Sequence, residues 1–363
     1  MNTIMTTALV LSVTAIFFAL VLTLSNRYIA NYGKVKVTIN KQSPYVVDGG
    51  LTLVEALQES GITVPTTCGG RGTCGLCKVK VINGAEGLLA VEKATLGNDV
   101  LAEGYRLACQ LKVTGDITVE LPDATLAVDK YDCIVDKCLT VSGNTRLIRL
   151  LLPENNSFQF TPGQHIQFFA PVYPENDTEV IRNYSIASGS VDKRVIELMV
   201  RKNSEGKCST YIHDYLREGD GVAISGPYGK FTYEEDDMPL LLIAVDAGIA
   251  ALYAMLNHIE ETGSRRKVTL LYFGTTEKDL FQEELFQPFD GLNVTITQKM
   301  TLSSEVNEFG IIDDEFEATF ERLVQENESL EIYICGRKET AGELRKFILK
   351  QGVPVDRVHY QQI

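Results

Sequence analysis

Hydrophobic and polar positions follow three different patterns along the chain. From Ile4 to Leu24 the sequence is apolar and carries no charge. At about 1.5 Å rise per residue, a helix of these 21 residues would span roughly 31 Å, enough to cross the hydrocarbon core of a bilayer. Beyond residue 32, short segments of strand-like alternation follow, and the last third alternates apolar runs with amphipathic segments. The chain is therefore predicted to be multidomain, with an N-terminal transmembrane helix.

The charges that flank the apolar segment indicate its orientation. No Lys or Arg precedes it, whereas Arg27, Lys34 and Lys36 follow it. A cleaved signal peptide, the alternative, typically has a basic start and a shorter apolar stretch. Positive charge on the C-terminal flank places that side in the cytoplasm. We therefore predict an anchor over residues 1–32, with the lipid bilayer as a partner, in a single-pass protein of the inner (cytoplasmic) membrane whose soluble domains face the cytoplasm.

Residues 33–125 show the pattern of an α+β domain. "KVKVTIN" and "YVVDGGLTLVEALQESGI" predict a hairpin followed by a helix, and "CKVKVINGA" predicts a strand that leaves a loop. That loop, "TTCGGRGTCGLC", is rich in cysteine and glycine.

Four cysteines of this domain have the spacing of a metal site. Cys68, Cys74 and Cys77 follow Cys-x5-Cys-x2-Cys, and Cys109 comes 31 residues later. Cytoplasmic thiols stay reduced, so a metal site is favoured over a disulfide framework. Structural zinc usually takes two short Cys-x2-4-Cys pairs, and only one is present here. The neighbouring glycines let backbone N–H groups approach bridging sulfides: Gly69, Gly70, Gly72 and Gly75. These features favour a [2Fe–2S] cluster, with zinc as the alternative.

The five-residue first gap resembles the ferredoxin branch found in bacterial and mitochondrial ferredoxins and in membrane-linked reductases, which implies a β-grasp fold. Two other cysteines, Cys133 and Cys138, lack ligand spacing and are predicted to be buried small hydrophobic residues.

Residues 126–236 contain short alternating strands, which predict an antiparallel β-barrel. Within it lies the tetrapeptide Arg182-Asn183-Tyr184-Ser185. "TPGQHIQF" precedes this tetrapeptide, and "GKCSTYIHDYL" and "ISGPYGKF" follow it.

This order of motifs resembles the ferredoxin–NADP+ reductase family, here fused to a [2Fe–2S] ferredoxin domain. The resemblance implies an FAD domain in which Arg182 pairs with the diphosphate. Tyr184 would pack against the isoalloxazine and Ser185 would face flavin N5, so these two are the predicted catalytic residues. A helix opening at Gly206 would hold phosphate. The cofactor-binding residues implied there are Gly206, Lys207, Cys208 and Ser209. Two alternatives without a role in binding stay open. Lys207 is then only a solvated side chain, and the residues Gly226, Pro227 and Gly229 of "ISGPYGKF" only form a turn.

Residues 237–363 alternate strands and helices, as in "PLLLIAVDAGIAALYAMLNHIEE", "KVTLLYFGTTEKDLFQEELF" and "LEIYICGRKETAGELRKFILKQG". Such units predict an α/β, Rossmann-like parallel sheet, and ligands of these sheets bind at the carboxyl ends of the strands. Gly248, Cys335 and Gly336 are the predicted nucleotide-binding residues at those ends.

The order of anchor, cluster domain, flavin barrel and nucleotide domain resembles the family of F subunits of sodium-translocating NADH:quinone oxidoreductases. The resemblance implies a subunit that takes hydride from NADH onto FAD. It would then pass single electrons through the [2Fe–2S] cluster to membrane subunits and quinone, in a multisubunit, ion-transporting respiratory complex.

The departures from this family lie in the nucleotide domain. Where the family has a glycine-rich turn ending in proline, this chain has "AVDAGIAA", and Asp246 places a negative charge where a diphosphate would approach. Arg337 and Lys338 either offset that charge or form a solvated face. Tyr360 in "HYQQI" is the nearest candidate to cover the flavin. The alternative function is therefore an electron relay without dehydrogenase activity, which takes electrons from a reduced protein.

Charge bears on the partners in two further ways. The formal net charge of −14 argues against nucleic acid as a partner, because phosphate binding needs a basic surface. Arg265 and Arg266 suggest a site for the 2′-phosphate of NADPH, but they precede the second strand of the nucleotide domain, on the end opposite to ligands, and are predicted to lie in a solvated turn.

Overall fold

The protein forms two compact units, residues 1–128 and 129–363. The computed structural model describes, apart from Ser12, Thr14 and Phe17, residues 32–40, 43–60, 62, 64, 70–73, 75, 77–85, 87–121, 130–154, 156–300, 311–327 and 329–363. Within these residues no helix has the length and apolar character needed to span a membrane. The predicted anchor, Ile4–Leu24, lies outside them except for the three isolated residues named above.

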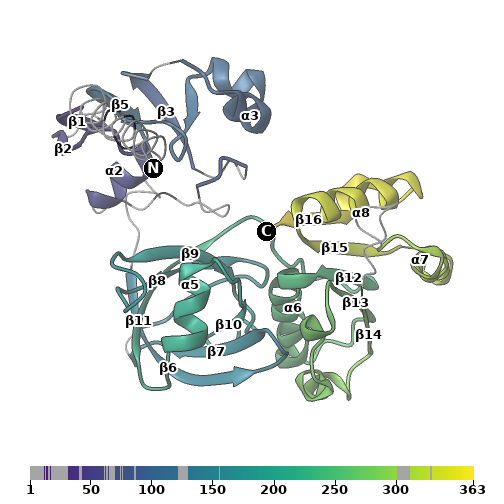
Figure 1. Cartoon of the computed structure of the whole chain (residues 1–363). Coiled ribbons are helices and arrows are strands. Elements are labelled where there is room, and N and C mark those ends of the chain that lie inside the picture. Colours follow the sequence, from purple (N-terminus) through teal and green to yellow (C-terminus); the bar gives the residue numbers. More distant parts are fainter. Residues whose placement is uncertain are drawn as a thin grey trace, which may run out of the picture. The chain divides into compact units, whose positions relative to one another are not determined.

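The first unit is built on a five-stranded sheet with the order β2-β1-β5-β3-β4 (Figure 1). Strand β1 pairs antiparallel with β2 and parallel with β5, and β3 pairs antiparallel with both β4 and β5. The strands are β1 (Lys34–Ile39), β2 (Tyr45–Asp48), β3 (Lys78–Asn83), β4 (Tyr105–Leu107) and β5 (Ile117–Glu120). The hairpin, the helix and the outgoing strand lie where the sequence predicts them.

Two helices complete this unit. Helix α2 (Leu53–Glu59) begins at Thr52, whose hydroxyl accepts from the backbone N–H of Glu55 while the Glu55 carboxylate accepts from the backbone N–H of Thr52. This reciprocal capping satisfies N–H groups that would otherwise have no partner. Its Leu53 and Leu57 are fully buried in the core under the sheet. Helix α3 (Ala90–Ala102), which the sequence pattern did not indicate, follows β3 and precedes β4.

The second unit contains a six-stranded antiparallel sheet with the order β10-β7-β6-β11-β8-β9. A bridge between Ile186 and Leu198 joins its two edges and closes it into a barrel, as predicted. Its strands are β6 (Lys130–Thr140), β7 (Thr145–Leu151), β8 (His165–Ala170), β9 (Val180–Ser185), β10 (Val195–Arg201) and β11 (Gly221–Tyr228). Cys133 is buried as expected, whereas Cys138 is only half-buried. The expectation for Cys138 was therefore wrong, since its strand position faces partly outward.

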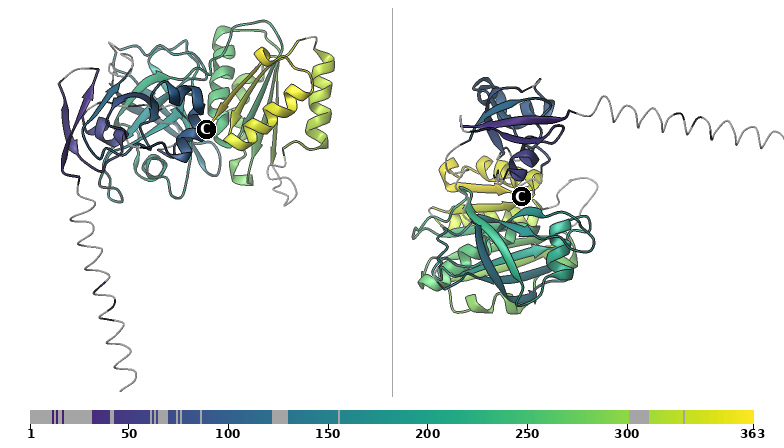
Figure 2. Two further views of the ribbon diagram at one scale, coloured as in Figure 1. Left: turned by 90° about the horizontal axis from the view of Figure 1, so that it is seen from above. Right: turned by 90° about the vertical axis from the view of Figure 1, so that its left-hand side faces the viewer.

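The same unit contains a five-stranded, all-parallel sheet with the order β14-β13-β12-β15-β16, as predicted for a Rossmann-like domain. Its strands are β12 (Leu240–Val245), β13 (Val268–Gly274), β14 (Val294–Met300), β15 (Glu331–Gly336) and β16 (Val358–Gln362). Its helices are α6 (Ile249–Thr262), α7 (Asp314–Glu326) and α8 (Lys338–Lys350). Helix α6 packs on one face, and α7 and α8 pack on the other (Figure 2).

Arg266 corrects one expectation from the sequence. Arg266 was predicted to lie in a solvated turn, but only 3% of the residue is exposed. Its guanidinium pairs with Glu331 at the start of β15 and lies 5.4 Å from the ring centroid of Tyr233. A charge this deeply buried is tolerated where a partner of opposite charge is present. Arg266 therefore contributes to the core at the amino ends of the strands.

Asp279 connects the barrel to the nucleotide sheet. Its carboxylate, 1% exposed, accepts from Arg201 Nε on β10 and from Asn144 Nδ2 in the β6–β7 turn, both at 2.6 Å. Burial raises the pKa of Asp279, but hydrogen bonds from Arg201, Asn144 and Thr276 outweigh it and lower the pKa to about 2.

The substitution Asp279→Asn is expected to remove an acid-sensitive part of the stability of this unit. A lowered pKa means that ionised Asp279 stabilises the fold above its unfolded value near pH 3.9, and that this contribution, about 2 kcal/mol, is lost as the pH falls towards about 2. Between about pH 6 and pH 3, the free energy of unfolding of the wild type should fall by about 1 kcal/mol more than that of the variant. Asp290→Asn, which changes an exposed aspartate of the same domain, is the control. Parallel pH profiles for the wild type and Asp279→Asn would contradict the assignment.

Candidate functional site

Two of the four predicted cluster ligands come together in the first unit. Cys77 lies just before β3 and Cys109 just after β4, and their Sγ atoms are 3.2 Å apart. This exceeds the length of a disulfide bond, about 2.05 Å, so the two thiols are close without being bonded. Both residues are buried, at 0% and 6% exposure. Two adjacent buried thiols suit shared ligation of one iron or zinc ion. Cys68 and Cys74 lie outside the described residues.

The loop between the cysteines has the backbone conformation that its glycines predict. Gly70, Gly72 and Gly75 have φ values of +85°, +75° and +71°. Side chains from later in the chain fasten this loop. Thr95 on α3 donates to the carbonyl of Gly72 at 2.7 Å, and Gln110 Nε2 donates to the carbonyl of Gly70 at 2.6 Å and approaches Cys109 Sγ at 3.7 Å. Sequence reasoning missed Thr95 and Gln110, although the position of Gln110 next to a ligand cysteine was a usable signal.

A buried ion pair positions the strand that leads to Cys109. Glu92 on α3 pairs with Arg106 on β4 at 2.7 Å, and its Oε1 also accepts from the backbone N–H of Leu107 at 3.0 Å. Burial raises the pKa of Glu92, but the hydrogen bonds from Arg106, Leu89 and Leu107 outweigh it, so the pKa lies below its usual range. The fixed carboxylate holds β4 against α3, and Leu107 on β4 pairs with Lys78, next to Cys77 at the end of the ligand loop.

Strand β9 of the barrel carries the predicted flavin tetrapeptide. Its register with β8 pairs Arg182 with Phe168, Tyr184 with Ile166, and Ser185 with His165. Since paired and alternate residues share a face, Arg182 and Tyr184 lie on one face of the strand and Ser185 lies on the other.

Tyr184 and Cys208 meet on the first of these faces. Helix α5 (Lys207–Thr210) lies beside β9 (Figure 1). The Tyr184 ring lies edge-on to Phe168, with ring centroids 6.3 Å apart. Burial and the neighbouring Cys208 thiol raise the pKa of Tyr184 well above its usual range, and burial raises the pKa of Cys208 to about 11. Both groups are therefore neutral near pH 7, and the exposed Arg182 brings a positive guanidinium to this face.

On the face of the barrel that carries Ser185, buried side-chain nitrogens have no hydrogen-bond partner among the described residues. They are both ring nitrogens of His165 and Nδ2 of Asn183. Burial lowers the pKa of His165 to about 4, so the ring is neutral near pH 7. Unpaired buried polar groups are costly, and a ligand with a hydrogen-bonding edge relieves that cost. A flavin ring has such an edge, so the residues present fit FAD. Sequence reasoning missed His165 and Asn183, because only the packed structure shows that they lack partners.

The loop before α5 is held by its own side chains. Ser209 Oγ donates to the carbonyl of Gly206 at 2.9 Å. A Cβ on Gly206 would lie 2.6 Å from the same Ser209 Oγ. The Ser209 hydroxyl thus shapes the loop, Lys207 is exposed, and Cys208 is buried against the barrel. Their predicted contacts with phosphate stay predictions.

The predicted nucleotide-binding residues meet at the carboxyl edge of the parallel sheet. A Cβ on Gly248 would lie 2.0 Å from the carbonyl oxygen of Cys335, and a Cβ on Gly336 would lie 2.8 Å from Cβ of Val245. Both glycines therefore permit close backbone approach. Cys335 is fully buried, which raises its pKa to about 12. Tyr360 packs its ring 4.6 Å from the guanidinium of Arg345 on α8.

Asp246 lies at the same edge and is 6% exposed. Its carboxylate accepts from the backbone N–H of Thr275 at 3.1 Å and from the Thr275 hydroxyl at 2.8 Å, and pairs with Arg337 at 3.1 Å. The residues at this edge therefore do not fit an incoming diphosphate while Asp246 stays in place. The charge offset considered for Arg337 is present as a direct ion pair.

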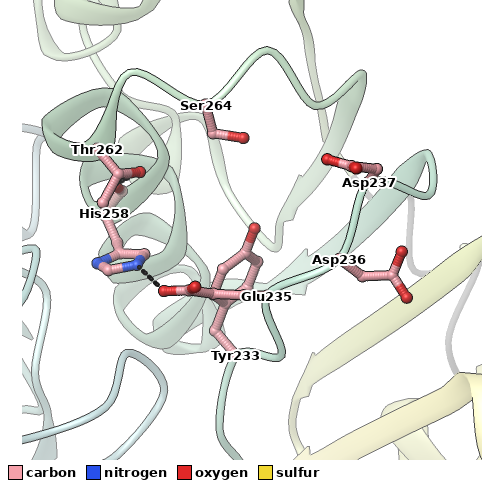
Figure 3. Close-up of a pocket in the computed structure, with 7 residues that line it drawn as sticks. All are labelled: Tyr233, Glu235, Asp236, Asp237, His258, Thr262 and Ser264. Atoms are coloured by element: carbon pink, nitrogen blue, oxygen red, sulfur yellow. Dashed lines mark hydrogen bonds and ion pairs between the residues drawn. The ribbon is translucent and has the colours of Figure 1, made fainter.

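A cavity of about 350 Å³ lies near the opposite, amino ends of the strands (Figure 3). Glu235, Asp236 and Asp237 line it, together with His258, whose Nε2 lies 3.4 Å from Glu235 Oε1. Because parallel sheets bind their ligands at the carboxyl ends, this acidic cavity is not the nucleotide site.

Comparisons with known proteins identify both redox domains. The family model for the 2Fe-2S iron-sulfur cluster binding domain matches residues 37–114, and that for the oxidoreductase FAD-binding domain matches residues 132–233. These matches confirm the predicted iron–sulfur and FAD domains. Among solved structures, the ferredoxin reductase of carbazole 1,9a-dioxygenase has a TM-score of 0.63 at 20% identity and covers 91% of this chain and 98% of its own. The Amycolatopsis cytochrome P450 reductase GcoB has a TM-score of 0.59 at 22% identity, with coverages of 90% and 98%. At these identities the two structures support the fold.

Curated relatives match nearly the whole chain. The F subunit of the Na(+)-translocating NADH-quinone reductase of Marinomonas sp. (strain MWYL1) is 26% identical and covers 99% of this chain and 97% of its own length. The protein of the same name in Haemophilus influenzae (strain PittEE) is 28% identical, with 90% of each covered. The chain is therefore an oxidoreductase with 2Fe-2S and FAD-binding domains, homologous over almost its entire length to the F subunits of the Na(+)-translocating NADH-quinone reductase.

Proposed function

We propose that the chain is the electron-input subunit of a membrane-bound respiratory oxidoreductase. It takes hydride from NADH onto FAD and passes single electrons through a [2Fe–2S] cluster to membrane subunits and quinone. The observation that carries the proposal is the homology over 99% of the chain to an F subunit of the Na(+)-translocating NADH-quinone reductase, together with both redox domains in one polypeptide. Sodium transport appears in the names of the relatives, and its extension to the complex around this chain is part of the proposal.

Each redox group requires specific residues of this chain. FAD supplies the conversion between two-electron hydride chemistry and one-electron transfer, which no side chain can perform. Arg182, exposed on β9, would pair with the FAD diphosphate, and Tyr184 and Ser185 would contact the flavin ring from the same strand. Cys68, Cys74, Cys77 and Cys109 would hold the iron, with the glycine-rich backbone around them donating to sulfur.

The membrane part of the proposal comes from the N-terminal sequence. The uncharged segment Ile4–Leu24 would anchor the protein in the cytoplasmic membrane as a single span, because Arg27, Lys34 and Lys36 follow it. The soluble units would then face the cytoplasm, where NADH is available. Membrane subunits of the same complex would be the electron acceptors.

A second function is favoured by one observation, the buried carboxylate of Asp246 at the nucleotide edge. In this alternative the chain relays electrons without dehydrogenase activity and accepts them from a reduced protein. FAD and the cluster keep their roles, and only the electron donor differs.

Anaerobic titration of the full chain, loaded with FAD and iron, tests both functions. NADH should bleach the flavin absorbance and, in sequence, the cluster absorbance, with a paramagnetic signal from the reduced cluster. Reduction by dithionite but not by NADH would reject the first function in favour of the relay. Protein that binds FAD but holds zinc or no metal would overturn both. Protein prepared without iron is the control, since its flavin should still bind.

A further inference from the structure

We infer that Asp246, Thr275 and Arg337 form an anion-binding site at the carboxyl edge of the nucleotide sheet, whose resident anion is the carboxylate of Asp246 itself. An external phosphate, such as the diphosphate of a pyridine nucleotide, binds there only after Asp246 is displaced or replaced. Asp246 is thus a specificity-determining residue for the electron donor. The inference rests on the proposed function only in placing a pyridine nucleotide at this edge.

The backbone of Asp246 is set to aim its side chain into this site. The residue follows β12 directly and has φ of +50°, in the left-handed region that Asp tolerates better than most residues. Its Oδ1 accepts two hydrogen bonds from Thr275, one from the backbone N–H at 3.1 Å and one from the hydroxyl at 2.8 Å. An unusual backbone conformation that ends in a fully engaged carboxylate indicates a fixed position.

Arg337 completes the set of donors. Its Nη2 lies 3.1 Å from Asp246 Oδ2 and also donates to the Thr275 hydroxyl at 3.1 Å. Asp246, Thr275 and Arg337 directly follow β12, β13 and β15, which are neighbours in the sheet. A guanidinium from the end of β15, and a hydroxyl and a backbone N–H from the end of β13, therefore converge on the carboxylate at the end of β12 between them. This donor set is typical of a site for a phosphate or a carboxylate.

Two anions cannot share these donors without repulsion. At an effective dielectric constant near 20, like charges about 4 Å apart repel strongly enough to weaken binding by up to about a thousandfold. Salt and solvent reduce this effect at the half-exposed Arg337, so the expected penalty for a bound diphosphate is about 30-fold or more.

Removing the carboxylate would leave a site suited to phosphate. A 3-10 turn, Asp246–Gly248, leads directly into helix α6 (Ile249–Thr262), and the N–H of Ile249 bonds to carbonyls of that turn. The turn and the helix therefore present their positive dipole end at Asp246. Gly248 holds this start against Cys335, since any larger residue would clash there. With Asp246 replaced, Arg337, the N–H of Thr275 and the dipole of α6 would all favour a bound anion.

Binding of ADP-ribose, which carries the diphosphate without a redox-active ring, tests the inference. Isothermal titration would compare the full-length FAD- and cluster-loaded wild type with Asp246→Asn and Asp246→Gly. Asn keeps the size of the side chain without its charge, and Gly accepts the positive φ without strain. Both variants should bind ADP-ribose about 30-fold more tightly or better, and inorganic pyrophosphate should compete. Adding Arg337→Gln to Asp246→Gly should abolish most of the gain.

The control is Asp290→Asn, which makes the same change in net charge at an exposed position of this domain and should leave the affinity unchanged. Affinities of both Asp246 variants within threefold of the wild type, at full FAD content, would overturn the inference. An equal gain in Asp290→Asn would do the same, since it would reveal only a general charge effect. Electron transfer between flavin and cluster after dithionite reduction needs no nucleotide. Its failure would reject the proposed function and leave the ADP-ribose result standing.

Discussion

The substitution Cys109→Ser is expected to abolish the [2Fe–2S] cluster while FAD stays bound. A serine hydroxyl is not deprotonated near pH 7 and is a poor ligand for iron, whereas the cysteine thiolate is the ligand that such clusters use. The Sγ atoms of Cys109 and Cys77 are 3.2 Å apart, and both residues are buried. A group exposed to water therefore cannot take the place of the Cys109 ligand. Substitution of a residue that only hydrogen-bonds to a metal ligand lowers the affinity for the metal by about 10–100-fold, and loss of the ligand itself should lower it further.

Iron and sulfide content, visible absorbance and the paramagnetic signal after dithionite reduction measure this effect. Cys77→Ser should behave in the same way. Cys138→Ser is the matched control, because Cys138 is a half-buried thiol of the barrel outside the predicted ligand set. Full iron content and an unchanged signal in Cys109→Ser would show that the ligand assignment is wrong. Zinc in the wild type would favour the alternative metal.

The cluster loop shows how far sequence spacing reaches. Ligand cysteines and glycines are local features, so the ferredoxin spacing is enough to predict the loop and its positive φ values. The residues that fasten the loop depend on tertiary packing. Thr95 lies on a helix that the hydrophobic pattern did not indicate, and its contact with Gly72 spans 23 residues of sequence. Such partners are set by how α3 lies on the unit, which no local pattern encodes.

The nucleotide domain shows a different limit. The alternation of strands and helices predicts the parallel sheet, and a lone aspartate in place of glycine indicates an altered site. Whether Arg337 neutralises that aspartate depends on which strands are neighbours. The order β13-β12-β15 places Thr275, Asp246 and Arg337 side by side, although 91 residues separate Asp246 from Arg337 in the sequence. The sequence alone therefore left the ion pair and the solvated face as equal alternatives.

A buried cation of this domain, Arg266, is expected to be among the largest contributors to the stability of the domain. Its guanidinium pairs with Glu331 and also donates to the carbonyl of Glu234 at 3.0 Å, while Glu331 Oε1 lies 3.0 Å from His359 Nε2. The two charged side chains are 0% and 3% exposed. Removing one partner from a buried pair leaves the other charge without compensation and typically costs about 3–5 kcal/mol. Arg266→Met should therefore lower the free energy of unfolding of the second unit by that amount.

Urea unfolding of the full chain, followed by FAD release, measures this loss. Lys202→Met is the control, because Lys202 and Asp214 form a partly exposed pair of the same unit, at 42% and 45% exposure, for which about 0–1 kcal/mol is expected. In the double variant Arg266→Met with Glu331→Leu, neither charge remains buried, so most of the loss should be recovered despite the unpaired His359. If Arg266→Met costs no more than Lys202→Met, the buried pair does not stabilise the domain. If the double variant is instead less stable than the single one, the attraction within the pair exceeds the cost of burying its charges, contrary to the general expectation for such pairs.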